Sequence, residues 1–302
     1  MRDIHAMSPE HARLPLGSVG VSGIRKPLMV ERPDGTHTLA VTFQVSVDLP
    51  SERKGSDLSR NAEILAETVD DTTTRPVGSL ESACSGIARE LLARHPYASE
   101  ASVIASAEYF LRNGISEEKR SFEDYRLLAE ARASRRADGS VSLRRSVGAE
   151  AVGMTACPCA METCRDRLVS EFPLLADPSL RELPMITHNQ RNRTRLVLDI
   201  PEGSDVEVDH LIAAIEAAQS SPTYAILKRG DEAQVVLNAH RHPKFVEDVL
   251  RDLLASLPAR FPDLPDSTFV RASTVSEESI HKFNVDASHQ VPLGDLRRPG
   301  ER

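Results

Sequence analysis

Tryptophan is absent from this chain of 302 residues, and aromatic residues make up only 4% of it. We therefore expect aliphatic cores. Glycine and proline number 15 and 19, which is too few for a disordered or collagen-like chain. No apolar run approaches the roughly 20 residues that a membrane span requires, and the first residues lack the apolar stretch of a secretory signal peptide. These absences predict a cytoplasmic protein with no membrane partner.

Positively charged residues are also relatively few. Lysine and arginine number 37 against 45 aspartate and glutamate residues, so the formal net charge is −8. A mildly acidic chain is a poor general binder of phosphate backbones, so we expect no nucleic-acid partner, although a local basic pocket for a small phosphorylated ligand stays possible. Four cysteines in a chain of this length do not form a disulfide framework. A cluster of them is instead a candidate for metal binding or for reactivity.

The length indicates two domains of roughly 150 residues each, which we place at residues 1–150 and 151–302. Alternating apolar residues predict strands in the first half, over residues 19–30, 39–47, 101–111, 121–133 and 141–152. Two helices lie between the second and third of these strands. The first is capped by Ser59 and runs to about Asp70, and the second carries an apolar stripe from Leu80 to Leu91.

The second half repeats this order in outline. It contains strand patterns at 194–200 and 268–275, short apolar segments at 224–227 and 235–237, a helix from Asp205, and an amphipathic helix from Phe245 to Leu257. A long irregular stretch at 153–193 joins the halves, and loops of this length are often functional. The pattern predicts the α+β class.

Cysteines are concentrated in the motif Cys157-Pro-Cys159. Two cysteines separated by one proline cannot readily close a disulfide, whereas thiolates are soft ligands for zinc or iron. The alternative is that both are small buried hydrophobic residues, as free cysteines usually are. Cys164 on a predicted helix and Cys84 on the apolar stripe are expected to be core residues.

Three further positions are candidates for acid, base or ligand chemistry. His188, in a polar run before a strand, is a metal ligand, a proton carrier or a surface histidine. Glu278 and His281 share a face only if the chain turns between them, because in a strand they would point to opposite faces. Glu247 stands where a helix starts and a carboxylate is favourable, or it accepts paired N–H donors from a ligand.

Two basic segments suit phosphate. Residues 53–60 combine three cations, including Lys54 and Arg60, with a helix start, an arrangement that suits an anion. Lys228 and Arg229 form a similar charged turn. The alternative for both segments is a solvated loop.

Taken in order, these motifs resemble one family, the type IB GTP cyclohydrolases, and more closely their archaeal-type branch. The resemblance spans nearly the whole chain through residues 19–21, 24–27, 47–49, 53–55, 59–60, 153–159, 187–191, 220–222, 227–229, 231–232, 245–248 and 278–281. It implies two tandem tunnelling-fold modules, each an antiparallel sheet with paired helices on one face. It also implies a homodimer or homotetramer with active sites between subunits.

The resemblance further implies a reaction on GTP. The guanine imidazole ring is opened, formate is released, and the skeleton recloses as a dihydroneopterin triphosphate or 2',3'-cyclic phosphate, in folate or other pterin biosynthesis. A divalent metal, Fe²⁺ with Zn²⁺ or Mn²⁺ as alternatives, would lower the pKa of a bound water.

Each motif carries an implied role. The implied metal ligands or proton carriers are Cys157, His188, Glu278 and His281, and of these Cys157, His188 and His281 are the implied catalytic residues. For Cys159, a neighbouring thiol, the resemblance leaves the role open, with an auxiliary one as a candidate, and Glu247 would anchor the guanine edge. The implied phosphate contacts are Lys54, Arg60, Arg191, Lys228 and Arg229.

The chain departs from the family pattern at three places. Asp57-Leu58 replaces His-Met, Phe283 replaces a second histidine of the archaeal-type branch, and Leu237 stands where bacterial members carry a glutamate. Phe283 can neither ligate a metal nor carry a proton. Two alternatives remain open: a nitrile-reducing tunnelling-fold enzyme, which would need a nicotinamide cofactor although no dinucleotide fingerprint is evident, and a diverged protein that binds a guanine or pterin nucleotide without turnover.

Overall fold

The computed structural model describes residues 5–8, 13–32, 35–180 and 182–298. Its elements up to the candidate cysteine motif are β1 (Leu16–Arg32), β2 (Gly35–Leu49), α1 (Leu58–Thr74), α2 (Leu80–Arg94), β3 (Glu100–Gly114), β4 (Arg120–Arg135) and β5 (Val141–Ala156). A short 3₁₀ turn, η1 (Glu117–Lys119), connects β3 and β4. The mixed α+β class is confirmed.

The remaining elements follow the cysteine motif. They are α3 (Pro158–Glu171), β6 (Asn189–Ile200), α4 (Val208–Ala218), β7 (Ser221–Pro222), α5 (Arg229–Arg241), α6 (Val246–Arg260), β8 (Phe269–Ser276), β9 (Val285–Pro292) and α7 (Leu293–Arg297), with 3₁₀ turns η2 (Pro173–Ala176) and η3 (Pro178–Leu180) after α3. Strands pair in the order β1-β2-β3-β4-β5-β6-β8-β9, and β7 pairs with β5. No helix of the described ranges combines the length and apolarity that crossing a membrane requires.

Two compact units divide the chain. The first comprises residues 1–109, 126–147 and 199–205, and the second comprises residues 110–125, 148–198 and 206–302. The units therefore do not follow a single cut at residue 150, because strands β3, β4, β5 and β6 each contribute residues to both. The assignment of residues 1–150 and 151–302 to tandem modules stays a prediction.

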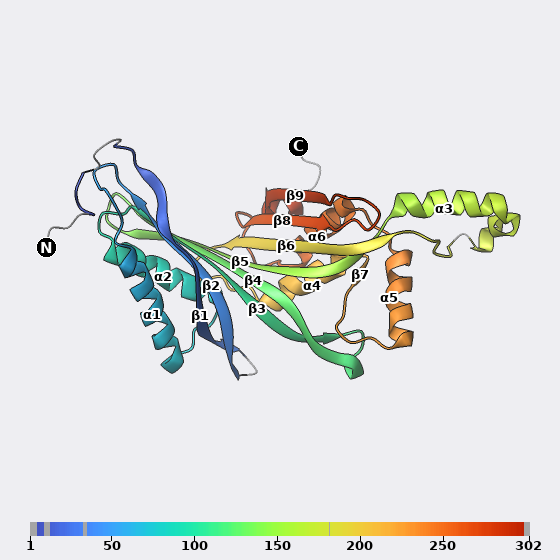
Figure 1. Cartoon of the computed structure of the whole chain (residues 1–302), viewed down its shortest axis with the longest axis horizontal. Coiled ribbons are helices and arrows are strands. Elements are labelled where there is room, and N and C mark those ends of the chain that lie inside the picture. The colour runs from blue at the N-terminus through green and yellow to red at the C-terminus, as the bar shows by residue number, and fades with distance from the viewer. Residues whose placement is uncertain (1–4, 9–12, 33–34, 181, 299–302) are drawn as a thin grey trace. The chain divides into compact units, whose positions relative to one another are not determined.

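The first unit has an aliphatic core, as its composition predicts. Helices α1 and α2 lie against the strands β1 and β2 (Figure 1). Val41, Phe43, Val45 and Val47 on β2 are almost completely buried, which confirms the half-buried strand predicted from their alternation. The core also includes Ile64 on α1, whose side chain is fully buried.

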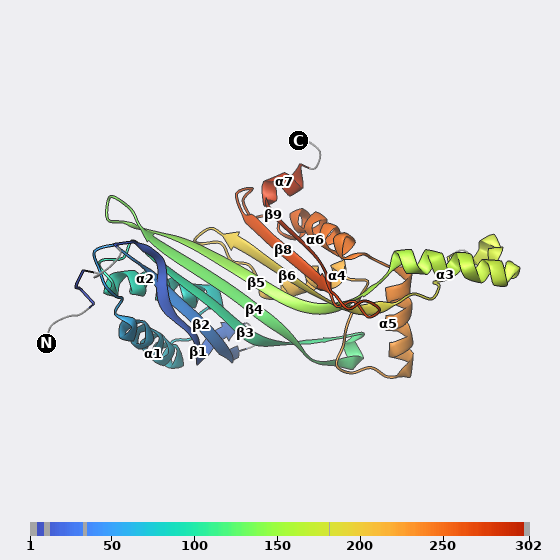
Figure 2. The same ribbon diagram turned by 45° about the horizontal axis from the view of Figure 1, so that its top comes forward.

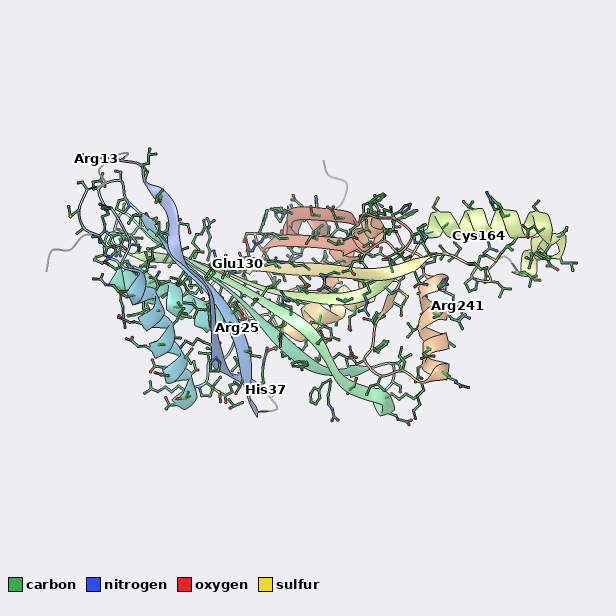
Figure 3. All side chains as sticks on the ribbon, in the orientation of Figure 1. Arg13, Arg25, His37, Glu130, Cys164 and Arg241 are labelled. Carbon is green, nitrogen blue, oxygen red and sulfur yellow. The ribbon has the colours of Figure 1, made fainter. Side chains whose placement is uncertain are left out.

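The second unit packs α4 and α6 together and places α6 against β8 and β9 (Figure 2). The predicted amphipathic helix is confirmed, since Val249, Leu253 and Leu257 on its inner face are fully buried. Helix α3 is different, because Met161 is the one residue of its described side chains that is buried. Cys164 lies half-buried on this helix rather than in a core (Figure 3).

Several predicted boundaries are wrong. Helix α1 begins at Leu58, so Ser59 lies inside its first turn and does not cap it. Helix α4 begins at Val208 rather than at Asp205. The apolar segment 235–237 belongs to the helix α5. The stretch 153–193 is largely regular, since it contains the end of β5, helix α3 and the start of β6, and β9 follows the strand that was expected to close the sheet.

A pair of glycine substitutions tests this packing. A Cβ atom at Gly153 on β5 would lie 2.9 Å from the Cβ of buried Gln219, so Gly153→Ala should reduce the free energy of unfolding by about 1–3 kcal/mol. Gly86 lies exposed inside α2 with open space around it, so Gly86→Ala should raise it by about 0.5–1 kcal/mol. Urea unfolding measures both. Equal effects of the two substitutions would contradict the close contact at Gly153.

Candidate active site

Backbone hydrogen bonds join the cysteine motif to the histidine motif. Cys157 is the N-cap residue of α3, and its sulfur accepts the N–H of Ala160 at 3.5 Å. The N–H of Cys157 donates to the carbonyl of His188 at 3.1 Å, and the hydroxyl of Thr187 donates to the carbonyl of Cys157 at 2.7 Å. The thiol and the imidazole are therefore held on adjacent segments.

The third donor-bearing segment is the loop between β8 and β9. The chain bends at residues 279–283, so the condition under which Glu278 and His281 act together is met. The N–H of Glu277 donates to the carbonyl of Arg191 on β6 at 2.9 Å. This bond anchors the start of the loop beside the strand that follows His188.

The three segments line one cavity of about 220 Å³. Cys157, His188, Glu278, His281 and Glu247 all contribute to its wall. The structure thus brings together the four proposed metal or proton residues and the proposed guanine anchor. The other lining residues are Gln190, Lys244, Phe245, Val246, Ser276, Phe283 and Val285.

The imidazole of His188 is largely buried, with 12% of its side chain exposed, as is the carboxylate of Glu278, with 10% exposed. Nδ1 of His188 lies 2.8 Å from Oε1 of Gln190 and 3.7 Å from Oε2 of Glu278. The ring of His281 stands almost perpendicular to that of His188 at a centroid distance of 6.5 Å. Phe283 stacks on His281 at 5.0 Å, so its phenyl ring supports that imidazole through its face.

The side chains of the site are of the chemical types that bind a divalent ion. Their arrangement, however, does not form a complete coordination shell. Among the residues that the structure describes, no three His, Cys, Asp or Glu side chains are close enough to hold an ion together. One thiol, two imidazoles and one carboxylate around a single cavity are nevertheless the ligand types that zinc and iron take. His281 is exposed on its loop, and exposed side chains change rotamer readily.

Glu247 lies in the first turn of α6 without serving as its cap. The N–H of Phe245 donates instead to Oδ2 of Asp248 at 3.0 Å. The side chain of Glu247 makes no hydrogen bond or ion pair with any residue in the described part of the chain. It also lines a second cavity of about 530 Å³ between α6, β9 and α7. Its carboxylate is therefore available to a ligand.

Several candidates lie away from the walls of this cavity. Cys159 is exposed on α3, and Arg191 is exposed on β6. Lys228 and Arg229 form the exposed start of α5, whose far end carries Arg241 (Figure 3). Cys84 is buried in α2, as predicted, and burial raises the pKa of its thiol.

Lys54 and Arg60 belong to the first compact unit. The N–H of Lys54 donates to the carbonyl of Met7 at 2.7 Å. The guanidinium groups of Arg53 and Arg60 lie 3.5 and 3.2 Å from Asp57. Asp57, which stands where the resembled family carries histidine, thus neutralises part of the positive charge at the start of α1.

The sequence did not predict a series of hydrogen-bonded polar side chains next to this segment. The ring of His95 is fully buried, with Nδ1 2.9 Å from the hydroxyl of Tyr97 and Nε2 2.8 Å from Oδ1 of Asn61. Tyr97 in turn bonds Ser56 at 2.9 Å and lies under the guanidinium of Arg53. No motif signalled this histidine, because its partner Asn61 is distant in sequence.

Gln190 is the second residue that was missed. It stands inside the polar run that contains His188, so a signal existed, but an uncharged side chain drew no functional interpretation. The structure places it against the ring nitrogen of His188.

The buried histidine predicts an acid-sensitive stability. Burial, and then the nearby Arg60, lower the pKa of His95 below its usual value of 6.5. A lowered folded-state pKa means that the stabilisation is present above the unfolded-state pKa and is lost as pH falls through the folded-state pKa. His95→Gln should therefore cost about 1–3 kcal/mol at pH 7.5, and the difference from wild type should shrink toward about pH 5. Denaturant unfolding across this range measures it, and a constant difference would contradict the assignment.

Comparison with known proteins identifies similar sequences. A family model described as type I GTP cyclohydrolase folE2 matches residues 1–287. GTP cyclohydrolase MptA of Methanococcoides burtonii is 39% identical, over 98% of this chain and 95% of that protein. GTP cyclohydrolase MptA 2 of Methanocella arvoryzae is 38% identical, over 98% of this chain and 97% of that protein.

Solved structures show the same fold at low sequence identity. The uricase from Arthrobacter globiformis aligns with a TM-score of 0.54 at 8% identity, covering 95% of each chain. A uricase from Bacillus fastidious aligns with a TM-score of 0.54 at 11% identity, covering 93% of this chain and 95% of that one. At such identities the likeness concerns the fold alone.

Proposed function

This chain belongs to the type I GTP cyclohydrolase folE2 family, and we propose that its reaction takes place in the cavity lined by Cys157, His188, Glu247, Glu278 and His281. The reaction opens the guanine imidazole ring of GTP, releases formate, and forms a dihydroneopterin triphosphate or 2',3'-cyclic phosphate. One observation supports this proposal: the carboxylate of Glu247 lines the same cavity as the side chains of Cys157, His188, Glu278 and His281.

The donor set supports a divalent ion as cofactor. We propose Fe²⁺, with Zn²⁺ or Mn²⁺ as alternatives, held by donors drawn from Cys157, His188, Glu278 and His281, since thiol and imidazole ligands suit iron and zinc. When bound, such an ion supplies a water whose pKa lies far below that of bulk water. His281 and Glu278 are the groups that would accept or return a proton at the opening ring, because both line the cavity.

The remaining proposed contacts are those to the guanine edge and to the phosphates of the substrate. Glu247 would accept the paired N–H donors of the guanine edge, and its lack of a competing partner within the described chain supports this role. The proposed phosphate contacts are Lys54, Arg60, Arg191, Lys228 and Arg229. We also propose two tandem tunnelling-fold modules, placement in the archaeal-type branch, and a homodimer or homotetramer whose subunits share the active sites.

A second candidate is a nucleotide-binding protein without turnover. Phe283 favours it, because a phenyl ring lines the cavity where the resembled branch has a second imidazole. A binder of this kind would keep the guanine anchor and lose the metal.

Product formation from GTP distinguishes the two candidates. Wild-type protein supplied anaerobically with Fe²⁺, Mn²⁺ or Zn²⁺ should release formate and a fluorescent pterin, with mass spectrometry identifying the phosphate form. Cys157→Ala should lose both metal and product, because it removes a metal donor from the cavity. Cys159→Ala, which changes the exposed thiol of the same motif, is the matched control and should keep both. Absence of product with every metal would remove the cyclohydrolase proposal, and retained GTP affinity would then favour the binder.

Glu247→Gln tests the guanine anchor. The loss of charge and the added donor should lower kcat/KM for GTP about 100-fold, given that hydrogen bonds to charged groups contribute roughly 1.5–3 kcal/mol each. The preference for GTP over inosine triphosphate, which lacks the exocyclic amine, should fall at the same time. Glu277→Gln, on an exposed neighbouring carboxylate, controls for charge near the site. Unchanged discrimination in Glu247→Gln would rule out this anchor.

A further inference from the structure

A series of hydrogen-bonded, buried side chains leads to His188 in the proposed active site. Oε1 of Gln190 lies 2.8 Å from Nδ1 of His188, and Nε2 of Gln190 donates to the hydroxyl of Thr155 at 3.0 Å. The hydroxyl of Thr155 lies 3.0 Å from that of Ser276. All three relay residues, Gln190, Thr155 and Ser276, are less than 10% exposed. The series is therefore largely shielded from solvent, although Gln190 and Ser276 also line the wall of the cavity.

The relay residues stand in a regular relation to the donors. Thr155 precedes Cys157 by two residues, Ser276 precedes Glu278 by two, and Gln190 follows His188 by two. Residues two apart along extended chain point to the same side. Each donor-bearing segment thus contributes one buried hydroxyl or amide two residues away from its donor.

The orientation of the Gln190 amide within the relay favours one tautomer of His188. Since the Nε2 amide of Gln190 is directed to Thr155, its carbonyl oxygen faces Nδ1, and a carbonyl oxygen only accepts. A carboxylate oxygen of Glu278 lies on the same side at 3.7 Å, so it too favours a proton on Nδ1. The lone pair of the ring is then left on Nε2.

We propose that Gln190 is a positioning residue which, supported by Thr155 and Ser276, holds His188 as its Nδ1-protonated tautomer and presents Nε2 as a ligand. The inference rests on the proposed metal-dependent function. Metal-binding histidines commonly donate their second N–H to a neighbouring acceptor, and loss of that acceptor weakens metal binding about 10–100-fold.

The chain contains a matched control network that does not touch the donors. Thr274 bonds Thr194 at 2.8 Å and donates to Asn192 at 3.0 Å, and Asn192 donates to Gln219 at 2.8 Å. Thr274, like Thr155, is almost completely buried and makes two side-chain hydrogen bonds. Thr155→Val and Thr274→Val therefore remove equivalent hydroxyl groups, one inside the relay and one outside it.

The test uses Co²⁺ as a spectroscopic probe on the full-length protein. Co²⁺ affinity is measured by competition with a chromophoric chelator, and the ligand field by visible absorption. Thr155→Val should weaken Co²⁺ binding about tenfold or more and alter the spectrum, whereas Thr274→Val should leave both within about twofold of wild type. Gln190→Leu should behave like Thr155→Val. Gln190→Glu, which retains an acceptor for Nδ1, should restore most of the affinity.

A second readout does not need a metal. Histidine-labelled protein examined by ¹⁵N NMR, with His188 assigned from the spectrum of His188→Gln, should show His188 protonated on Nδ1 in wild type. Thr155→Val should shift that tautomer and Thr274→Val should not.

The outcomes separate this inference from the proposed function. Equal weakening by both threonine variants, or an Nε2-protonated His188 in wild type, would overturn the relay while leaving the cyclohydrolase proposal intact. Wild-type protein that binds no Co²⁺ but contains the Nδ1-protonated ring would overturn the metal proposal and support the tautomer assignment. Far-UV circular dichroism confirms that each variant is folded.

Discussion

The pairing of β5, β6 and β8 as neighbours is the constraint on which the candidate site depends. Cys157 follows β5, His188 precedes β6 and Glu278 follows β8, so neighbouring strand ends deliver three donors to one place. The hydrogen bonds from Cys157 to His188 and from Glu277 to Arg191 continue this adjacency into the loops. A shift in the register of any of these strands would separate the donors or turn their side chains to the opposite face.

The interior of the second unit is polar next to the candidate site, where Gln190, Thr155 and Ser276 are buried. Buried hydroxyl and amide groups are costly unless they are hydrogen-bonded, and a fully connected network specifies a unique arrangement. Gln190, Thr155 and Ser276 are bonded to one another or to His188. An aliphatic interior would be simpler to stabilise, so a satisfied polar chain next to metal-type donors fits a role in orienting them.

The elements that bury a regular apolar face could be predicted from the sequence. Alternation marked β2, and the apolar stripe of α6 placed that helix to within a few residues. Strand β9 could not be recognised in this way, and helix α3 is predicted only around Cys164 within a stretch expected to be irregular, because their side chains are mostly exposed and carry no apolar period. The division into compact units could not be predicted either. Strands such as β3 and β4 contribute residues to both units, and no change in local composition marks where a strand passes from one unit to the other.

Within the candidate site, charged and sulfur-bearing residues could be predicted and their neutral supports could not. Cys157, His188, Glu278 and His281 are predicted because their motifs, taken in order, resemble one family, and the structure places them on one cavity. Gln190 contacts His188 through a hydrogen bond and Phe283 contacts His281 through ring stacking, and the spacing of the residues reveals neither contact. The two supports also differ in kind, because Phe283 restrains the plane of His281 by stacking but offers it no acceptor, whereas Gln190 offers His188 both restraint and an acceptor. The two imidazoles of the site are therefore unequal, with His188 suited to a fixed ligand position in the proposed metal site and the exposed His281 suited to move between the proposed ion and the proposed substrate.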